Sequence, residues 1–208
     1  MSTAKHKKID SKGRLLLGEE FANQDVIIEP QKDGTLLLKP AVVVQIAEAW
    51  LYKNKTAFQA VKRGLEQASK REFAEDPRSG KDVKLVKDVE EWSVFSTQWT
   101  KEASASYSNL RAAAETARLN REKKKIDKAS KQEGLFKQVM KCIDLLSSNP
   151  RHTGLHTLEY DSLPHPYDPN KKIFEAYAQN KTPGAYRVFW CYGPKRSQIT
   201  IIAITAHP

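Results

Sequence analysis

The pattern of apolar and polar residues near the N-terminus predicts short strands. Apolar residues gather in brief runs at residues 8–9, 15–17, 26–29 and 35–39. Short runs divided by turn residues are typical of strands, and Asp33-Gly34 between the last two runs is a strong hairpin signal. Four strands of this length cannot bury a core alone. We therefore expect this segment to require a second copy of itself.

A helical pattern follows the short strands. Apolar residues recur at spacings of three and four, or their sums, at Ile46, Trp50, Phe58, Val61, Leu65 and Ala68. This spacing places them on one face of a helix over residues 46–70, and that face requires a partner. Residues 73–80 contain Pro77 and Gly80 and are predicted to be a linker. Residues 83–89 mix apolar and charged side chains, which favours an arm that gains structure by docking.

A further unit is predicted to begin at Trp92. Residues 92–95 have a strand pattern, and Thr100 is placed to cap a helix. The apolar face of that helix consists of Ala103, Tyr107, Leu110, Ala114 and Ala117. Ser130 and Glu133 form a capping box in front of a second helix, which ends at Asn149-Pro150.

Four strand patterns follow the second helix, at residues 154–160, 173–178, 185–192 and 198–205. A strand, two helices and then a strand meander are best closed by packing both helices against one face of an antiparallel sheet. The predicted fold class is therefore α+β, with a short-strand segment and a helical arm in front of this domain.

Composition is that of a soluble protein with modest cores. The hydrophobic fraction is 39% and the mean hydropathy is −0.63. The sequence has no apolar run long enough for a membrane span and no secretion signal after its lysine-rich start, so a cytoplasmic location is expected. Cys142 and Cys191 have no Cys or His at metal-ligand spacing, which favours buried thiols over a disulfide or a zinc site.

The net charge of +10 is unevenly distributed. Residues 92–208 carry 18 Lys and Arg against 10 Asp and Glu, whereas residues 1–91 carry 17 against 15. The C-terminal part is therefore the better candidate for binding a polyanion. Solubility alone is the alternative explanation of the excess.

The order of motifs in residues 92–208 resembles the RelE/ParE toxin superfamily. The resemblance depends on the helix ending in Asn149-Pro150, the pair Gly154-Leu155, the strand Phe174-Glu175-Ala176-Tyr177, the strand beginning Tyr186-Arg187, and a last strand reaching His207. It implies a RelE-like domain that acts as a ribosome-dependent endoribonuclease on messenger RNA. In such a reaction the RNA 2′-OH attacks the adjacent phosphate, and neither a metal nor another cofactor is needed.

The N-terminal segment is similar to the swapped-hairpin antitoxins of the AbrB/MazE type. The similarity depends on residues 8–14, Gly34 and residues 36–40, without the Ile-Pro expected after Gly13-Arg14. It implies three parts: a DNA-binding and dimerising segment at residues 1–45, a toxin-neutralising arm and linker at 46–91, and the toxin domain at 92–208. The implied partners are messenger RNA on the ribosome, operator DNA, the chain's own toxin domain, and a second copy forming a homodimer.

Four residues are the candidate catalytic groups. By the resemblance, Arg187 corresponds to the arginine that follows a tyrosine on the penultimate strand, and a guanidinium can hold phosphate oxygens. Pairing with a carboxylate such as Glu175 is its alternative role. His207 can exchange protons near neutral pH, unless it is a frayed terminal residue. Glu175 and Tyr177 share one face of a strand, and either can be the general base or stack on a base of the RNA, while Tyr177 can instead pack on the sheet.

Two sets of basic residues are candidates for contacts with nucleic acid. The candidate RNA-binding residues are Lys123, Lys124, Lys125, Lys171, Lys172 and Lys181. The candidate DNA-binding residues are Lys7, Lys8, Lys12 and Arg14. Such side chains bind phosphates without reading sequence, and ordinary solvated surface is the alternative for both sets.

Two other functions remain open. A ParE-like poison of DNA gyrase has the same fold without cutting RNA, although a His207 near the terminus is not expected there. A non-enzymatic regulator would use the second unit only to shape DNA binding by the first. His152, His156 and His165 lie at irregular spacings, which argues against a metal site.

Overall fold

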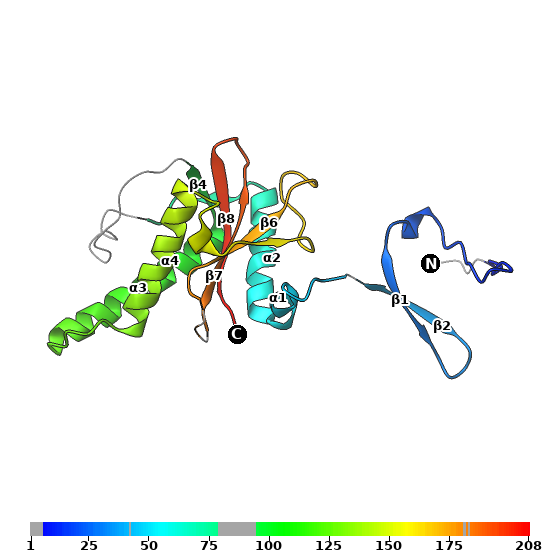
Figure 1. The fold of residues 1–208 in the computed structure, drawn as a ribbon, viewed down its shortest axis with the longest axis horizontal. Coiled ribbons are helices and arrows are strands. Elements are labelled where there is room, and N and C mark those ends of the chain that lie inside the picture. Colours follow the sequence, from blue (N-terminus) through cyan, green and yellow to red (C-terminus); the bar gives the residue numbers. More distant parts are fainter. Residues whose placement is uncertain (1–5, 42, 79–94, 181, 183) are drawn as a thin grey trace. The chain divides into compact units, whose positions relative to one another are not determined.

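A computed structural model describes residues 6–41, 43–78, 95–180, 182 and 184–208 (Figure 1). The chain divides into two compact units, Met1–Val43 and Val44–Pro208. The first contains a two-stranded hairpin, and the second combines helices with a six-stranded sheet. The α+β class predicted from the sequence is confirmed at this level.

The first unit is built on the hairpin of β1 (Asp25–Pro30) and β2 (Leu36–Ala41). Its turn is held by the Asp33 carboxylate, which accepts a hydrogen bond from the backbone N–H of Thr35, and Gly34 has a φ of 85°. The Asp-Gly prediction of this hairpin is therefore confirmed. A short 3-10 helix, η1 (Glu19–Phe21), precedes it.

The strands predicted at residues 8–9 and 15–17 are wrong. These residues belong to no strand of the described structure. Between them, the Asp10 carboxylate accepts hydrogen bonds from the backbone N–H groups of Lys12 and Arg14, and this closes a local turn. Aspartate competes for backbone donors in this way, which removes them from a strand ladder.

The second unit is organised around a sheet with the strand order β3-β4-β8-β7-β6-β5. Its strands are β3 (Phe73–Ala74), β4 (Ser96–Thr100), β5 (Leu158–Tyr160), β6 (Ile173–Tyr177), β7 (Tyr186–Tyr192) and β8 (Gln198–Ala206). Strands β5 to β8 form the predicted antiparallel meander. The prediction of a wholly antiparallel sheet is wrong, because β4 pairs in parallel with β8.

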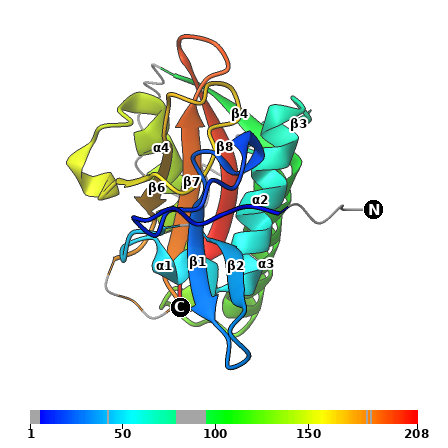
Figure 2. The same ribbon diagram turned by 90° about the vertical axis from the view of Figure 1, so that its right-hand side faces the viewer.

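Helices cover both faces of the sheet. Helices α3 (Lys101–Lys123) and α4 (Lys131–Ser148) pack on one face, as predicted, around the buried side chains of Tyr107, Phe136 and Trp190. Helices α1 (Ala49–Lys53) and α2 (Lys55–Ser69) lie on the other face with Val61, Phe189 and Ile202. Figure 2 shows α2 running alongside β8. The sheet is therefore the middle layer of three.

The helix boundaries follow local chemistry. Thr100 caps α3 by accepting a hydrogen bond from Ala103 N–H, and Ser130 with Glu133 forms the predicted capping box of α4. The single helix predicted over residues 46–70 is wrong, because Asn54 ends α1 and caps α2 through Ala57 N–H. Ile46 precedes both helices and is 95% exposed, so its predicted place on the apolar face is also wrong.

Three segments near the sheet differ from the sequence-based predictions. The predicted linker at residues 73–80 begins with β3, which pairs with β4. Of the strand predicted at residues 92–95, only Phe95 is described; it belongs to no strand, and β4 begins at the next residue, Ser96. Gly154 and Leu155 lie in a 3-10 helix, η3 (Thr153–Leu155), in place of a strand. The predicted arm at residues 83–89 lies outside the described residues, as do residues 92–94.

Both cysteines are buried and free, as predicted. Burial raises the pKa of the Cys142 thiol to about 12. No helix in the described part of the chain is both long and apolar enough to cross a membrane.

Candidate functional site

Strand alternation brings three of the four candidate catalytic residues to one face of the sheet. In the register of β6 and β7, Tyr177 lies opposite Arg187, and Glu175 is two residues before Tyr177. Directly opposed residues of antiparallel strands point to the same face, and so do residues two apart. Ile173 and Phe189, which have the same parity, belong to the core under α1 and α2. The candidate site therefore lies on the face covered by the arm.

Arg187 and Glu175 form a buried ion pair. The Arg187 Nε lies 2.9 Å from Glu175 Oε1, and the two side chains are 6% and 0% exposed. The contact is too poorly aligned to be a hydrogen bond, so it is an ion pair only. The guanidinium Nη1 donates to the carbonyl of Gln179 at 2.7 Å, and its carbon lies 3.7 Å from the centre of the Tyr177 ring. The carboxylate partner suggested for Arg187 is thus present.

The other oxygen of Glu175 receives two hydrogen bonds. The Tyr160 hydroxyl donates to Oε2 at 2.5 Å, and the Trp50 indole Nε1 donates to the same oxygen at 3.2 Å. Burial raises the pKa of the Glu175 carboxyl, although the hydrogen bond from Tyr160 and the charge of Arg187 oppose the shift. Burial also raises the pKa of the Tyr160 hydroxyl, and the nearby Glu175 carboxylate adds to this. A carboxyl in such surroundings can hold a proton that an exposed one would release.

His207 joins the same cluster from the end of β8. Its backbone N–H donates to Ala185 O at 2.6 Å, so the pairing of β7 and β8 continues past Ala206. Its ring lies 4.4 Å from the Trp50 ring, centre to centre. Trp50 therefore contacts both His207 and Glu175, and it covers the cluster from the side of α1.

Polar contacts fix both ends of α1 to the sheet. The buried carboxylate of Glu48, in front of the helix, accepts hydrogen bonds from the backbone N–H groups of Asp161 and Ser162 at 2.9 and 3.2 Å. After the helix, Asn54 Nδ2 donates to Ala206 O at 3.2 Å. Trp50 is held between these two anchors.

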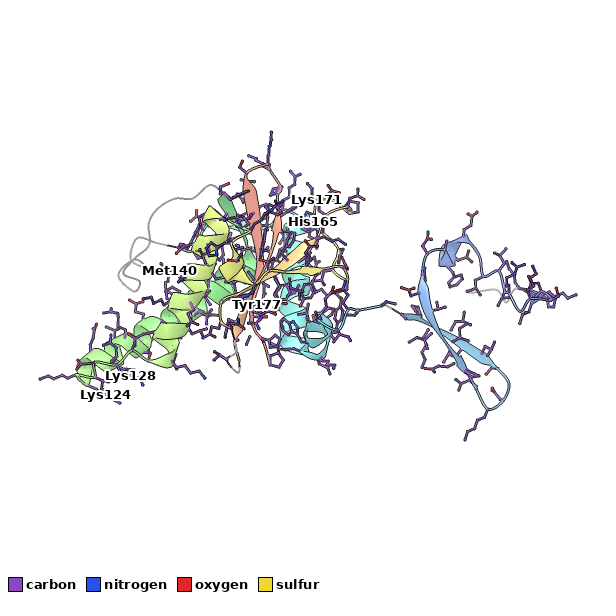
Figure 3. All side chains as sticks on the ribbon, in the orientation of Figure 1. Lys124, Lys128, Met140, His165, Lys171 and Tyr177 are labelled. Carbon is purple, nitrogen blue, oxygen red and sulfur yellow. The ribbon has the colours of Figure 1, made fainter. Side chains whose placement is uncertain are left out.

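The candidate RNA-binding lysines do not gather at this cluster. Lys123 ends α3, Lys124 and Lys125 follow it, and all three are exposed. Figure 3 shows Lys124 at the outer tip of the α3–α4 pair, away from Tyr177, with Lys171 in a different part of the unit.

The remaining RNA-binding candidates lie before β6 or outside the described residues. Lys172 pairs with Asp161, and Lys171 lies 3.5 Å from Asp168. Lys181 lies outside the described residues.

The candidate DNA-binding residues lie in the first unit. Lys7, Lys8, Lys12 and Arg14 are all exposed. Arg14 Nε forms an ion pair with Asp10 at 2.8 Å. An exposed pair of this kind contributes little to stability.

Two members of the cluster were not predicted as site residues. Trp50 was recognised only as part of an apolar helix face, and Tyr160 only as the end of a strand pattern. The alternation of β5 against β6 could have placed Tyr160 opposite Ile173 and near Glu175. Nothing local indicated that Trp50 reaches the same carboxylate, because that contact joins residues 125 positions apart.

Titratable groups elsewhere in the described residues form no cluster that could hold a metal ion. Comparison of the chain with models of known protein families, with characterised proteins and with solved structures finds no match.

Proposed function

We propose that this chain is a fused toxin–antitoxin protein. Residues 92–208 are a metal-independent endoribonuclease that cuts messenger RNA on the ribosome and so inhibits translation. Residues 46–91 neutralise it, and residues 1–45 bind operator DNA as a homodimer. The observation that carries this proposal is the position of Trp50, which contacts both Glu175 and His207 from the arm segment.

The cluster contains the groups that such a cleavage needs. As the 2′-OH attacks, Glu175 accepts its proton, and the Arg187 guanidinium stabilises the negative charge that builds on the phosphate oxygens. The His207 imidazole donates a proton to the departing 5′-oxygen. The Tyr177 ring, which now faces the guanidinium, provides a surface on which a base can stack.

The same geometry explains inhibition. Arg187 is bound by Glu175 and by the Gln179 carbonyl, and its side chain is 6% exposed. A phosphate can reach it only if the ion pair with Glu175 opens, and Trp50 of α1 holds the other oxygen of that carboxylate in place. Because the arm is part of the chain, its local concentration is on the order of millimolar or more, so the covered state dominates.

Substitution of Trp50 in the full-length protein tests the proposal. Trp50→Ala removes the hydrogen bond to Glu175 and the contact with His207, so we expect cleavage of ribosome-bound messenger RNA and arrest of growth. Trp50→Ala combined with His207→Ala should abolish the cleavage. The matched control is Tyr52→Phe, which removes another α1 contact, the hydrogen bond to Ser162 O, without uncovering the cluster.

A folded Trp50→Ala protein that leaves ribosome-bound RNA intact would count against the nuclease. Folding is checked by circular dichroism and by the urea midpoint, so that an unfolded variant is not mistaken for an inactive one.

A non-enzymatic DNA-binding regulator is the second candidate. It is favoured by the full burial of Glu175 in its pair with Arg187, which is an arrangement that structural ion pairs also adopt. Under this alternative, His207→Ala changes neither RNA nor operator binding, and Trp50→Ala produces no cleavage.

A further inference from the structure

A cavity lies on the opposite face of the sheet from the Arg187 cluster. It has a volume of about 440 Å³ and opens between the segment after α4 and strands β5 to β7. Phe174 and Trp190 form part of its wall and belong to the core beneath α3 and α4. Because neighbouring residues of a strand face opposite ways, Phe174 and Glu175 point to different sides of the sheet. The volume falls within the range of about 300–1,000 Å³ that is usual for small-molecule sites.

The inner wall of this cavity is aromatic. The Phe174 and Trp190 rings are stacked, with centres 4.7 Å apart and planes 23° from parallel. Tyr192 meets both edge-on, at 5.8 Å from Phe174 and 5.0 Å from Trp190. Phe174 and Tyr192 are only partly buried, so the wall is open to a flat ligand. Such surfaces bind planar rings by stacking.

Charged residues of both signs form the rim. Arg151 and Glu159 line the cavity, and both are exposed. The indole Nε1 of Trp190 is buried and has no hydrogen-bond partner among the described residues. Buried donors are almost always paired, so this unpartnered indole is an exception among the described residues near the cavity.

We propose that this cavity binds a nucleotide whose base carries amino donors, with guanine the best match. The base stacks on Phe174 and Tyr192, the two rings of the wall that are only partly buried. The Glu159 carboxylate accepts hydrogen bonds from the N1–H and amino group of guanine, which uracil cannot offer in the same arrangement. The Arg151 guanidinium binds the phosphate.

The charge of the protein favours this ligand over an uncharged aromatic one. The chain has a net charge of +10, with the excess concentrated in residues 92–208, and this attracts anions. The shared chemistry is a phosphorylated nucleoside, which is either a free mononucleotide or one residue of a single-stranded RNA. Cleavage chemistry is not required, so the site stands independently of the proposed nuclease.

Calorimetric titration of the full-length protein tests the pocket. The ligands are guanosine 5′-monophosphate, uridine 5′-monophosphate, guanosine, and a short single-stranded RNA with one guanine. We expect the guanine nucleotide to bind roughly tenfold more tightly than the uracil nucleotide. Glu159→Gln should remove that preference. Arg151→Ala should weaken the binding of guanosine 5′-monophosphate but not that of guanosine.

Exposed positions away from the cavity provide the controls. Glu115→Gln on α3 and Lys137→Ala on α4 make the same kinds of change without touching the pocket, and they should leave every affinity unchanged. Phe174→Leu keeps an apolar side chain but removes the stacking ring, and it should weaken the binding of every ligand by a similar factor.

The titration distinguishes a free nucleotide from a single-stranded RNA as the ligand. Equal affinities for the mononucleotide and the RNA identify the free nucleotide. A much higher affinity for the RNA, still reduced by Glu159→Gln, identifies the RNA. The proposal is refuted if neither guanosine 5′-monophosphate nor the RNA binds, or if Glu159→Gln and Arg151→Ala leave the affinities unchanged, as the controls do.

Discussion

At the scale of single residues, the chemistry of the candidate site depends on the surroundings of Glu175. Its carboxyl is fully buried, beside one cation and two hydrogen-bond donors. The sequence predicted that Glu175 and Tyr177 share a face and left a pair between Arg187 and Glu175 as an alternative, since two strands with period-two alternation suffice for both. The sequence did not predict that the Glu175 carboxyl would be fully buried, because Trp50 and Tyr160 reach it from other elements.

The pH dependence of stability should reveal this burial. Burial raises the pKa of Glu175 in the folded state above its ordinary value of 4.5. The unfolded chain therefore releases this proton first as the pH rises, so the Glu175 contribution to stability is complete below pH 4.5 and is lost as the pH passes the folded pKa. In Glu175→Gln, residue 175 does not titrate. As the pH rises from 4.5 through the folded pKa, the free energy of unfolding of the wild-type protein should therefore fall relative to that of the variant.

Urea unfolding of both proteins across mildly acid to neutral pH measures the difference. Parallel stability curves would show that the carboxyl keeps its ordinary pKa. Glu159→Gln, an exposed position on β5, is the control and should give a curve parallel to the wild type.

At the scale of elements, local signals and long-range pairing differ in how well they can be predicted. Thr100, Ser130 and Glu133 act within one helical turn, so the starts of α3 and α4 follow from the sequence. The break at Asn54 was missed because apolar spacing continues across it. The parallel pairing of β4 with β8 was missed because it joins strands about a hundred residues apart, and no local pattern encodes that choice.

The close approach of α2 to β8 makes a specific prediction about Gly64. A Cβ there would lie 2.0 Å from the backbone oxygen of Ile202, so Gly64→Ala must push the helix off the sheet. We expect a loss of about 1–3 kcal/mol, although alanine favours helices. Gly134 in α4 has nothing within 4 Å of the same position, so Gly134→Ala should instead stabilise by up to about 1 kcal/mol.

Urea midpoints of the two glycine variants test this packing. Equal shifts of the same sign would mean that helix propensity alone decides both positions, and that α2 does not approach β8 so closely.

At the scale of the whole molecule, none of the described residues of the first unit, 6–41 and 43, is buried. Ile27, Ile28, Leu36 and Leu37 of the hairpin are 53%, 58%, 55% and 45% exposed. An isolated two-stranded hairpin is marginally stable in water. The requirement for a second copy, inferred from the shortness of the strands, stays a prediction.

We therefore expect the full-length protein to be a dimer that forms through this unit. Leu36→Asp should convert it to a monomer, because the charge would be buried in the shared surface. Leu119→Asp places the same change at an exposed leucine of α3, 46% exposed, and should leave the mass unchanged. Light scattering after size-exclusion chromatography measures both, and a monomeric wild type would contradict the prediction.

The middle position of the sheet restricts how the proposed enzyme could be switched on. Ala60, Val61 and Leu65 of α2 are buried against it, so excision of the whole arm would expose an apolar face and leave a fragment prone to aggregate. The five-residue α1 is a much smaller piece, fastened at its two ends by Glu48 and Asn54. Activation of the proposed enzyme would thus consist of the detachment of α1 while α2 stays in place. The binding of one partner could drive this detachment, and its release could reverse it.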